Sequence, residues 1–557
     1  MNGISSTLID NILTNNLSIE NKLGIIYSDL SDHFTIFHFC TLKVKKVNYK
    51  KTTEIRMNMS KLNVEKFKCK ISESSWDKVY LESDANVAYN YLWNVISMHF
   101  NDCFPAKIIG VKQRKQPSNP WYTSDMLKML RKKNKLYKKY VLSPTPLSFH
   151  VYKKYRNHYV HALRSAKKKY YSDKINTTSN NVKGTWKVIN QILQRDVKSS
   201  QPGIPSVFFD GTNKYESSEE IAHQFNTFFA NSGLELVKKI TITHNDPLEY
   251  IQPFYPQMLS FQPPNIEEIS EIIDDLKLST AGHDGISAFL VKQIKHSILK
   301  PLTHIVSLSL ATGVVPDDLK VAKVIPLFKA DDKACFNNYR PISILPCFSK
   351  VFEKVVYKRL FFHINNNSIL YKHQYGFRKH HSTYMALSHL LDSVTSALDK
   401  NKFICSIFLD LSKAFDTVDH TILLSKLQKY GFQHNVLKWL RNYICDRSQF
   451  VCINGCISDR LNIQCGVPQG SVLGPLLFLL YINDLCFVSK DLTPIMFADD
   501  TTLLLCHSDF NVLVDQVNEG LSFYDKWFRT NKLSINIKKK QIILFSVVKR
   551  HVHLIIK

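Results

Sequence analysis

Two adjacent carboxylates, Asp499 and Asp500, stand between short apolar runs at 494–498 and 501–505. These runs predict a tight β-hairpin that carries the acids at its tip. Neighbouring acids repel one another unless a cation neutralises them, and divalent metals such as Mg²⁺ bind carboxylate oxygens. The hairpin is therefore a candidate metal site. Three other Asp-Asp pairs, at 274–275, 317–318 and 331–332, have polar flanks that indicate solvated loops or helix caps.

A third carboxylate, Asp410, follows the almost wholly apolar run 403–409, which is typical of a strand buried on both faces. An acid at the end of such a strand either caps the next helix or binds a ligand. If this strand lies beside the hairpin, the three acids form one site. Two metal ions held by three carboxylates can activate a 3′-hydroxyl and stabilise a pyrophosphate leaving group. The chemistry indicated is nucleotidyl transfer.

Three segments in this order resemble the motifs of the reverse transcriptases of non-LTR retrotransposons of the jockey kind. Leu-Asp-Leu-Ser-Lys-Ala-Phe-Asp at 409–416 is similar to motif A, and Phe-Ala-Asp-Asp at 497–500 is similar to motif C. Between them, Gly-Val-Pro-Gln-Gly-Ser at 466–471 is similar to motif B. The resemblance implies an α+β fold of the right-hand polymerase type, with fingers and a palm sheet packed on helices. It also implies a preceding basic helical region and a thumb that is missing or truncated.

The implied activity is RNA-directed DNA polymerisation with two Mg²⁺ ions, Mn²⁺ being the alternative. Asp410, Asp499 and Asp500 would be both the catalytic and the metal-binding residues. The implied partners are a template RNA, a DNA primer or target, and deoxynucleoside triphosphates; the oligomeric state stays open. Two rival readings remain: a decayed, inactive remnant that only binds nucleic acid, and an RNA-templated RNA polymerase with the same palm.

Further site residues follow from the same resemblance. Lys329 and Arg340, on a predicted hairpin of strands at 321–329 and 338–343, would grip a triphosphate, since a guanidinium binds phosphate oxygens in bidentate fashion. An aromatic at Phe415 would exclude a 2′-hydroxyl. The remaining assignments are Gln469 and Gly470 for the nucleotide, Lys539 as a proton donor to pyrophosphate, and Arg378 for a template phosphate. Each assignment has an alternative. Lys329, Arg340 and Arg378 could be surface cations, Phe415 could be a core residue, and Lys539 could lie in a solvated turn of three lysines.

A basic segment precedes the polymerase motifs. Residues 107–174 hold 19 Lys and Arg but two acids, within a chain whose net charge is +26. Helical periodicity on both sides of Pro144 and Pro146 predicts an αα-hairpin at about 121–174. Such a density of like charge favours a phosphate backbone as partner, although a solvated charged face is the alternative. The candidate nucleic-acid-binding residues are Arg131, Lys132, Lys133, Lys167, Lys168 and Lys169.

Composition limits the class of protein. The 12 cysteines form no CxxC pair, so neither a zinc site nor a disulfide framework is indicated. The run 476–482 is too short to span a bilayer, and we expect no transmembrane segment or signal peptide. We expect an intracellular protein, in either nucleus or cytoplasm.

The expected domains are four. Residues 1–50 resemble the end of an apurinic-type endonuclease through Ser-Asp-His at 31–33, and we expect no endonuclease activity. Residues 51–200 form the basic helical linker region. Residues 201–315, with a Gly-His-Asp-Gly segment similar to motif 0, form an N-terminal extension of the polymerase. Residues 316–557 form the fingers and palm. Whether Met1 is the true start stays open.

Overall fold

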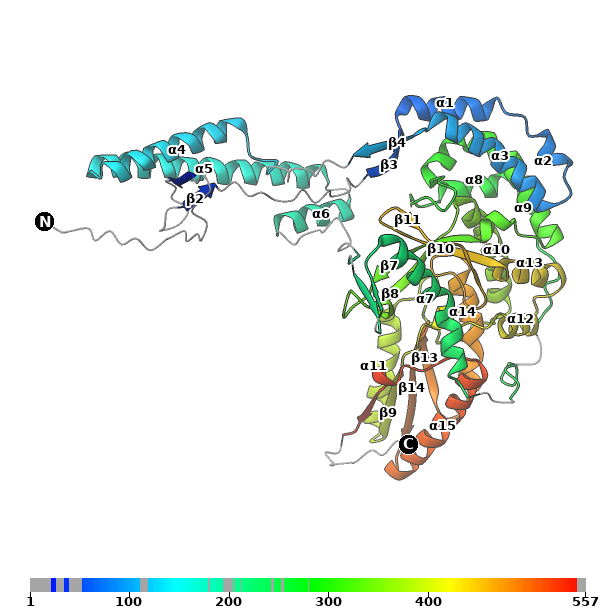
Figure 1. Ribbon diagram of the computed structural model, residues 1–557. Helices are drawn as coiled ribbons and strands as arrows, with labels where there is room; N and C mark the ends of the chain where they lie inside the picture. Colours follow the sequence, from blue (N-terminus) through cyan, green and yellow to red (C-terminus); the bar gives the residue numbers. More distant parts are fainter. Residues whose placement is uncertain are drawn as a thin grey trace. The chain divides into compact units, whose positions relative to one another are not determined.

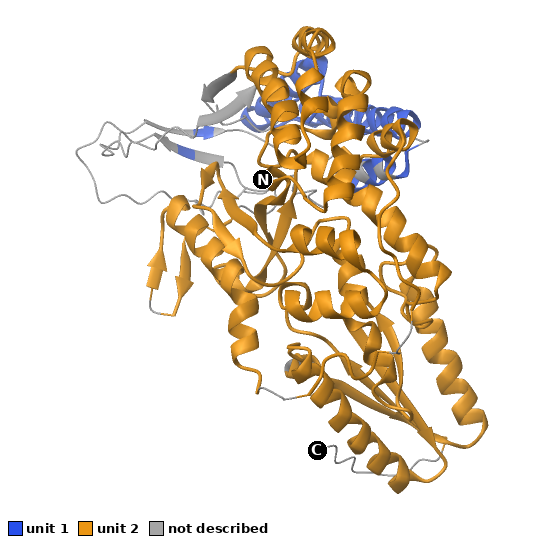
Figure 2. Ribbon diagram, turned by 90° about the vertical axis from the view of Figure 1, so that its right-hand side faces the viewer, with its two compact units in different colours: residues 1–56, 108–203 blue, residues 57–107, 204–557 orange. Residues whose placement is uncertain are grey.

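The structure is a computed structural model (Figure 1). Two compact units are distinguished in it (Figure 2). One unit comprises residues 1–56 and 108–203, and the other comprises residues 57–107 and 204–557. The structure describes residues 22–26, 35–39, 53–110, 119–178, 181–193, 204–205, 207–211, 213–241, 245–251, 255–278 and 280–547. No helix of these described residues is both long and apolar enough to cross a membrane.

The first unit contains the predicted αα-hairpin, formed by α4 (Ser124–Leu142) and α5 (Pro146–Thr177). Thr145 and Ser148 form a capping box at the start of α5, and Pro146 occupies its first turn. Aromatic rings join the two helices, with Tyr137 and Tyr152 at 5.1 Å between centroids. The unit also holds α6 (Val182–Ile192) and an antiparallel pair, β1 (Lys22–Ile26) with β2 (Thr35–Phe39). The Ser-Asp-His segment at 31–33 lies outside the described residues.

The second unit is built around a four-stranded sheet in the order β13 (Thr493–Phe497), β14 (Asp500–His507), β9 (Phe403–Leu409), β15 (Gln541–Phe545). All neighbouring strands are antiparallel. Successive side chains of a strand point to opposite faces. Accordingly Ile404 packs with α11 (Thr383–Asp399), whereas Cys405 and Ile407 join the main core with α15 (Phe510–Thr530). The strand that precedes Asp410 is thus buried on both faces, as predicted.

A second sheet runs in the order β11 (Cys456–Ile457), β10 (Arg447–Ile453), β7 (Val321–Phe328), β8 (Tyr339–Ile344), and β12 (Leu461–Ile463) also pairs with β10. β7 and β8 form the predicted antiparallel hairpin, and β10 lies parallel to β7. Asn454 and Gly455 have φ of 51° and 88°, as the central residues of a type I′ turn do, and Asn-Gly is the dipeptide that favours this turn. α7 (Ser218–Lys238) packs against β10.

Helices provide most of the remaining core, which is centred on α3 (Ala85–Cys103), α9 (Ala288–Thr312) and α10 (Cys347–Asn366). Around them lie α1 (Lys61–Ser72), α2 (Asp77–Leu81), α8 (Ile266–Asp274), α12 (His420–Lys429), α13 (His434–Ile444) and α14 (Gly474–Ile482). Short pairs are formed by β3 (Thr53–Met57) with β4 (Ala106–Gly110) and by β5 (Phe208–Asp210) with β6 (Asn213–Tyr215). Five 3₁₀ turns complete the described elements, at Asp317–Lys320, Phe336–Asn338, Ala414–Asp416, Asn483–Phe487 and Ile537–Lys539. The fold is mixed α and β, as expected.

One buried ion pair and its hydrogen bonds join four of these elements: α12, α14, α15 and the 3₁₀ turn Asn483–Phe487. Lys426 of α12 and Asp484 lie 2.6 Å apart, and both side chains are 0% exposed. The indole of Trp527, in α15, donates to the other carboxylate oxygen at 3.0 Å, and Lys426 also donates to the Tyr481 carbonyl at 2.8 Å. Because both charges are hydrogen-bonded, the pair is tolerated in the core.

Candidate active site

The predicted hairpin with the acids at its tip is formed by β13 and β14. Phe497 pairs with Asp500, which leaves Ala498 and Asp499 in a two-residue turn. Ala498 has φ of 57°, a left-handed conformation that is uncommon for a residue other than glycine. The amide oxygen of Gln374 accepts from the backbone N–H groups of Gly376 and Ala498, both at 2.9 Å. A buried side chain therefore holds the strained turn in place.

Asp410 lies directly beside this turn. Thr501 pairs with Leu409 at the end of the register between β14 and β9, so continuing that register by one residue places Asp500 opposite Asp410, which directly follows β9. Like charges in opposed positions destabilise a sheet. Burial raises the pKa of Asp499, and the charges of Asp500 and Asp410 raise it further. The pKa of Asp500 is raised by desolvation and then by Asp410.

Cations face these acids across the cleft. The ammonium of Lys539 lies 2.7 Å from Asp410, and the Asn536 side chain donates to the same carboxylate oxygen at 3.0 Å. Desolvation lowers the pKa of Lys329, and the charges of Lys539 and Arg340 lower it further. Binding of a polyanion would relieve the repulsion among Lys329, Arg340 and Lys539.

In the described part of the chain, no three His, Cys, Asp or Glu side chains are already gathered closely enough to hold a metal ion. The Asp410 carboxylate is turned toward Lys539 instead. The acids still fit a divalent cation chemically, because hard carboxylate oxygens with raised pKa values are stabilised when a cation arrives. Lys539 is the counter-cation of Asp410 in this structure.

The loop that corresponds to motif B is joined by backbone hydrogen bonds to two other parts of the site. Val467 N–H donates to the Phe415 carbonyl, and Ser343 N–H donates to the Gln469 carbonyl, both at 2.8 Å. Gly470 has φ of 127°, and a Cβ there would meet the Ser343 oxygen at 2.4 Å, so glycine is required. The loop thus links the segment after Asp410 to strand β8.

Phe415 stacks on Phe478 with ring centroids 4.6 Å apart, and Phe377 meets its ring edge-on at 5.9 Å. Its ring is half-buried and lines a cleft of about 740 Å³. The same cleft is lined by seven other residues that the sequence singled out: Lys329, Arg340, Asp410, Gln469, Asp499, Asp500 and Lys539. The structure therefore brings eight of the predicted residues into one cavity.

Of the residues predicted from the polymerase motifs, two lie outside the lining of this cleft, Gly470 and Arg378. Gly470 shapes the loop instead. The Arg378 guanidinium donates to the carbonyls of Tyr371 and Gln374, both at 3.1 Å, and so holds the backbone next to the hairpin turn.

On the αα-hairpin, Arg131, Lys132, Lys168 and Lys169 are exposed, whereas Lys167 is half-buried. Lys133 is 6% exposed, with its ammonium over the ring of Tyr159 at 5.7 Å. It therefore belongs to the interior of the helix pair in this structure.

Sequence reasoning did not single out three residues that shape the site. Gln374 and Asn536 hold the hairpin turn and Asp410, as described above. Glu353 is fully buried in α10 and accepts from the backbone N–H groups of Val472 and Leu473 and from the Ser349 hydroxyl at 2.9 Å. An acid on the apolar face of a helix was a visible signal for Glu353. For the two amides the signal was absent, because their partners are distant in sequence.

An acidic hairpin lies beside a strand-end carboxylate, and the cleft that contains these acids is also lined by Lys329, Arg340 and Lys539. Residues 329–554 match the family described as "Reverse transcriptase (RNA-dependent DNA polymerase)". This match, together with the relatives described next, confirms the resemblance of the chain to the reverse transcriptases of jockey-like non-LTR elements.

Three relatives from Drosophila melanogaster illustrate the similarity. The probable RNA-directed DNA polymerase from transposon X-element is 28% identical over 336 residues, which is 59% of this chain and 36% of the relative. That from transposon BS is 25% identical over 429 residues, 75% of this chain and 47% of the relative. The RNA-directed DNA polymerase from mobile element jockey is 27% identical over 307 residues, 54% of this chain and 33% of the relative. The chain therefore spans between a third and a half of the length of these relatives.

Proposed function

We propose that this chain is an RNA-directed DNA polymerase of a jockey-like non-LTR mobile element, which copies RNA into DNA by divalent-metal-dependent nucleotidyl transfer. The observation that carries the proposal is the placement of Asp410 opposite Asp500, beside the turn with Asp499. The family match over residues 329–554 supports it independently.

Asp410, Asp499 and Asp500 are proposed to hold two Mg²⁺ ions, with Mn²⁺ as a substitute. When bound, the ions supply acidity to the primer 3′-hydroxyl and neutralise developing charge on the phosphates. Lys539 has to leave Asp410 before that carboxylate can bind a cation, since the two are now paired. The freed ammonium is then available as a proton donor to pyrophosphate.

Lys329 and Arg340 are proposed to bind the triphosphate. Both line the cleft that contains the acids, and Arg340 offers a planar fork for two phosphate oxygens. Phe415 is proposed to close the floor of the sugar site, because its ring is held from behind by Phe478 and cannot retreat. A ribonucleotide would then clash through its 2′-hydroxyl.

In architectural terms, we propose that sheet β13-β14-β9-β15 with α11 and α15 is the palm and that hairpin β7-β8 belongs to the fingers. Residues 316–557 would form this fingers-palm region, with 201–315 as its N-terminal extension. The template is RNA and the primer DNA, and we expect the protein to act inside the cell.

The αα-hairpin is proposed to bind the phosphate backbone of RNA or target DNA. Its exposed cations, Arg131, Lys132, Lys168 and Lys169, carry the charge for this contact, and net positive charge of this density binds polyanions in a salt-dependent way. The rival reading, an inactive remnant, also predicts such binding, so binding alone does not distinguish the two.

The test is primer extension by the full chain on an RNA template with a DNA primer, deoxynucleotides and Mg²⁺, beside Asp499→Ala. We expect product from the natural chain that disappears on adding EDTA and in the variant. Binding of template-primer without any metal-dependent product would support the remnant. Efficient use of ribonucleotides in place of deoxynucleotides would instead support an RNA polymerase.

A further inference from the structure

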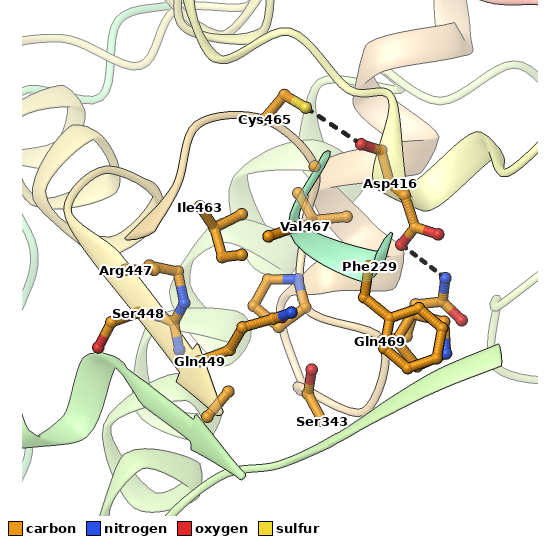
Figure 3. Close-up of a pocket in the computed structure, with 15 residues that line it drawn as sticks. Phe229, Ser343, Asp416, Arg447, Ser448, Gln449, Ile463, Cys465, Val467 and Gln469 are labelled. Carbon is orange, nitrogen blue, oxygen red and sulfur yellow. Dashed lines mark hydrogen bonds between the residues drawn. The ribbon is translucent and has the colours of Figure 1, made fainter. Parts of the chain in front are cut away.

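Asp416 and Gln469 face one another in the pocket that Figure 3 shows, and both also line the neighbouring cleft that contains the three acids. The Gln469 amide nitrogen donates to the Asp416 carboxylate at 2.8 Å. By surface area Asp416 is only part-buried, yet desolvation raises its pKa to about 6, against the opposing effects of the Gln469 hydrogen bond and the charge of Lys413. Because desolvation of the ionised Asp416 carboxylate destabilises the fold, we infer that this acid has a role other than folding.

The backbone on both sides of this contact is immobilised. The Cys465 thiol donates to the Asp416 carbonyl at 3.3 Å. A Cβ on Gly233 would lie 2.1 Å from that carbonyl oxygen, and a Cβ on Gly466 would lie 3.0 Å from the Asp416 Cα. The two side chains therefore meet in a close-packed setting that leaves little freedom of distance or angle.

The chemistry of the pair then dictates how the amide is turned. An ionised carboxylate has acceptors but no donor, so it must face the amide nitrogen of Gln469 and never its oxygen. The amide oxygen is left on the other side. Without the acid, the amide could rotate by a half turn and present its N–H₂ group instead.

We propose that Asp416 is a positioning residue that fixes the Gln469 amide so that its oxygen is presented to a hydrogen-bond donor of the incoming nucleotide. The donor is a sugar hydroxyl or a base N–H. The inference rests on the proposed polymerase function and adds a nucleotide-selecting role to a residue outside the three catalytic acids.

The test measures the nucleotide Kd and the maximal rate of single-turnover primer extension for the full chain and five variants. Asp416→Ala removes the acceptor, and Asp416→Asn permits both amide orientations. Loss of a hydrogen bond to a charged group corresponds to roughly a tenfold change or more, and we expect it as a tenfold rise in Kd with little change in maximal rate. Asp419→Asn is the matched control, because Asp419 caps α12 and pairs with Lys532 without touching Gln469.

The other two variants test the polarity of the contact. Gln469→Glu opposes two carboxylates, so its activity should fall as pH rises from 6 to 8.5, unlike that of the natural chain. Combining it with Asp416→Asn restores a donor–acceptor pair with an oxygen toward the cleft. We expect the double variant to bind nucleotide more tightly at pH 8 than Gln469→Glu alone.

Dideoxynucleotides identify the donor. Loss of discrimination between deoxy- and dideoxynucleotides in Asp416→Asn assigns the contact to the 3′-hydroxyl; retained discrimination with the same rise in Kd assigns it to the base. Unchanged nucleotide Kd in both Asp416 variants, or an equal rise in Asp419→Asn, overturns the proposal. If the natural chain itself neither binds nucleotide nor extends the primer, the polymerase proposal fails and this inference fails with it.

Discussion

Removing the Glu353 carboxylate should loosen the start of α14 and, with it, the loop that presents Gln469. Glu353 is 0% exposed and accepts the backbone N–H groups of Val472 and Leu473, so Glu353→Ala leaves two buried donors without a partner. Each unsatisfied group costs about 1–3 kcal/mol, which makes about 3 kcal/mol a conservative total. Glu353→Gln can still offer an oxygen to both donors and should lose much less.

Native-state hydrogen exchange reports this change locally, which matters in a chain with two units that need not unfold together. A loss of about 3 kcal/mol corresponds to exchange that is faster by more than about 100-fold. We expect that acceleration at the amides of Val472, Leu473, Gly474, Leu476 and Leu477 in Glu353→Ala and a change below about tenfold in Glu353→Gln. Equal protection of these amides in Glu353→Ala and the natural chain would refute the role assigned to the carboxylate.

Four further predictions follow from the same structure. Asp499→Asn should lower metal-dependent primer extension by at least about 1,000-fold while leaving RNA affinity within about twofold, as filter binding would check. Phe415→Ala should raise the ribonucleotide-to-deoxynucleotide ratio of kcat/KM by about 10-fold or more, and an unchanged ratio would count against a steric gate. The pKa of Asp416 rises from 3.8 to about 6 on folding, so its protonated form stabilises the fold at low pH and this contribution is lost as pH rises through 6. In urea titrations, the free energy of unfolding of Asp416→Asn should therefore exceed that of the natural chain by up to about 3 kcal/mol above pH 6. Below pH 4 the two free energies should be equal. Lys426→Met should destabilise the second unit by about 3–5 kcal/mol, because it leaves Asp484 buried without its cation, and Lys426→Met with Asp484→Leu should recover part of that loss in the same titration.

The sequence was most informative where local pattern and chemistry coincide. Apolar runs that end in acids predicted β9 and the β13-β14 hairpin, and their antiparallel register then places Asp410 opposite Asp500. The Asn-Gly turn and the proline-separated basic helices were equally local signals. In each case the deciding interactions lie within a few residues of one another.

Features set by distant packing were not predictable in this way. Glu353 meets Val472 across 119 positions, and Gln374 meets Ala498 across 124. Lys133 looked like a surface cation because one chain position does not reveal which helix face a partner covers. Residues 57–107 belong to the second unit because α3 makes apolar contacts with α9, and such contacts between distant helices cannot be read from local sequence.

The left-handed turn at Ala498 has a consequence for mutational drift. A Cβ on Gly376 would lie 2.2 Å from the Ala498 nitrogen and 2.9 Å from the Ala498 Cβ, so neither position can grow independently of the other. Glycine at 498 would relax the turn, but it would also release the conformational restraint on the acid that follows. We therefore expect that, among random substitutions, those at Gly376 and Ala498 abolish function more often than those at the larger apolar residues of the core.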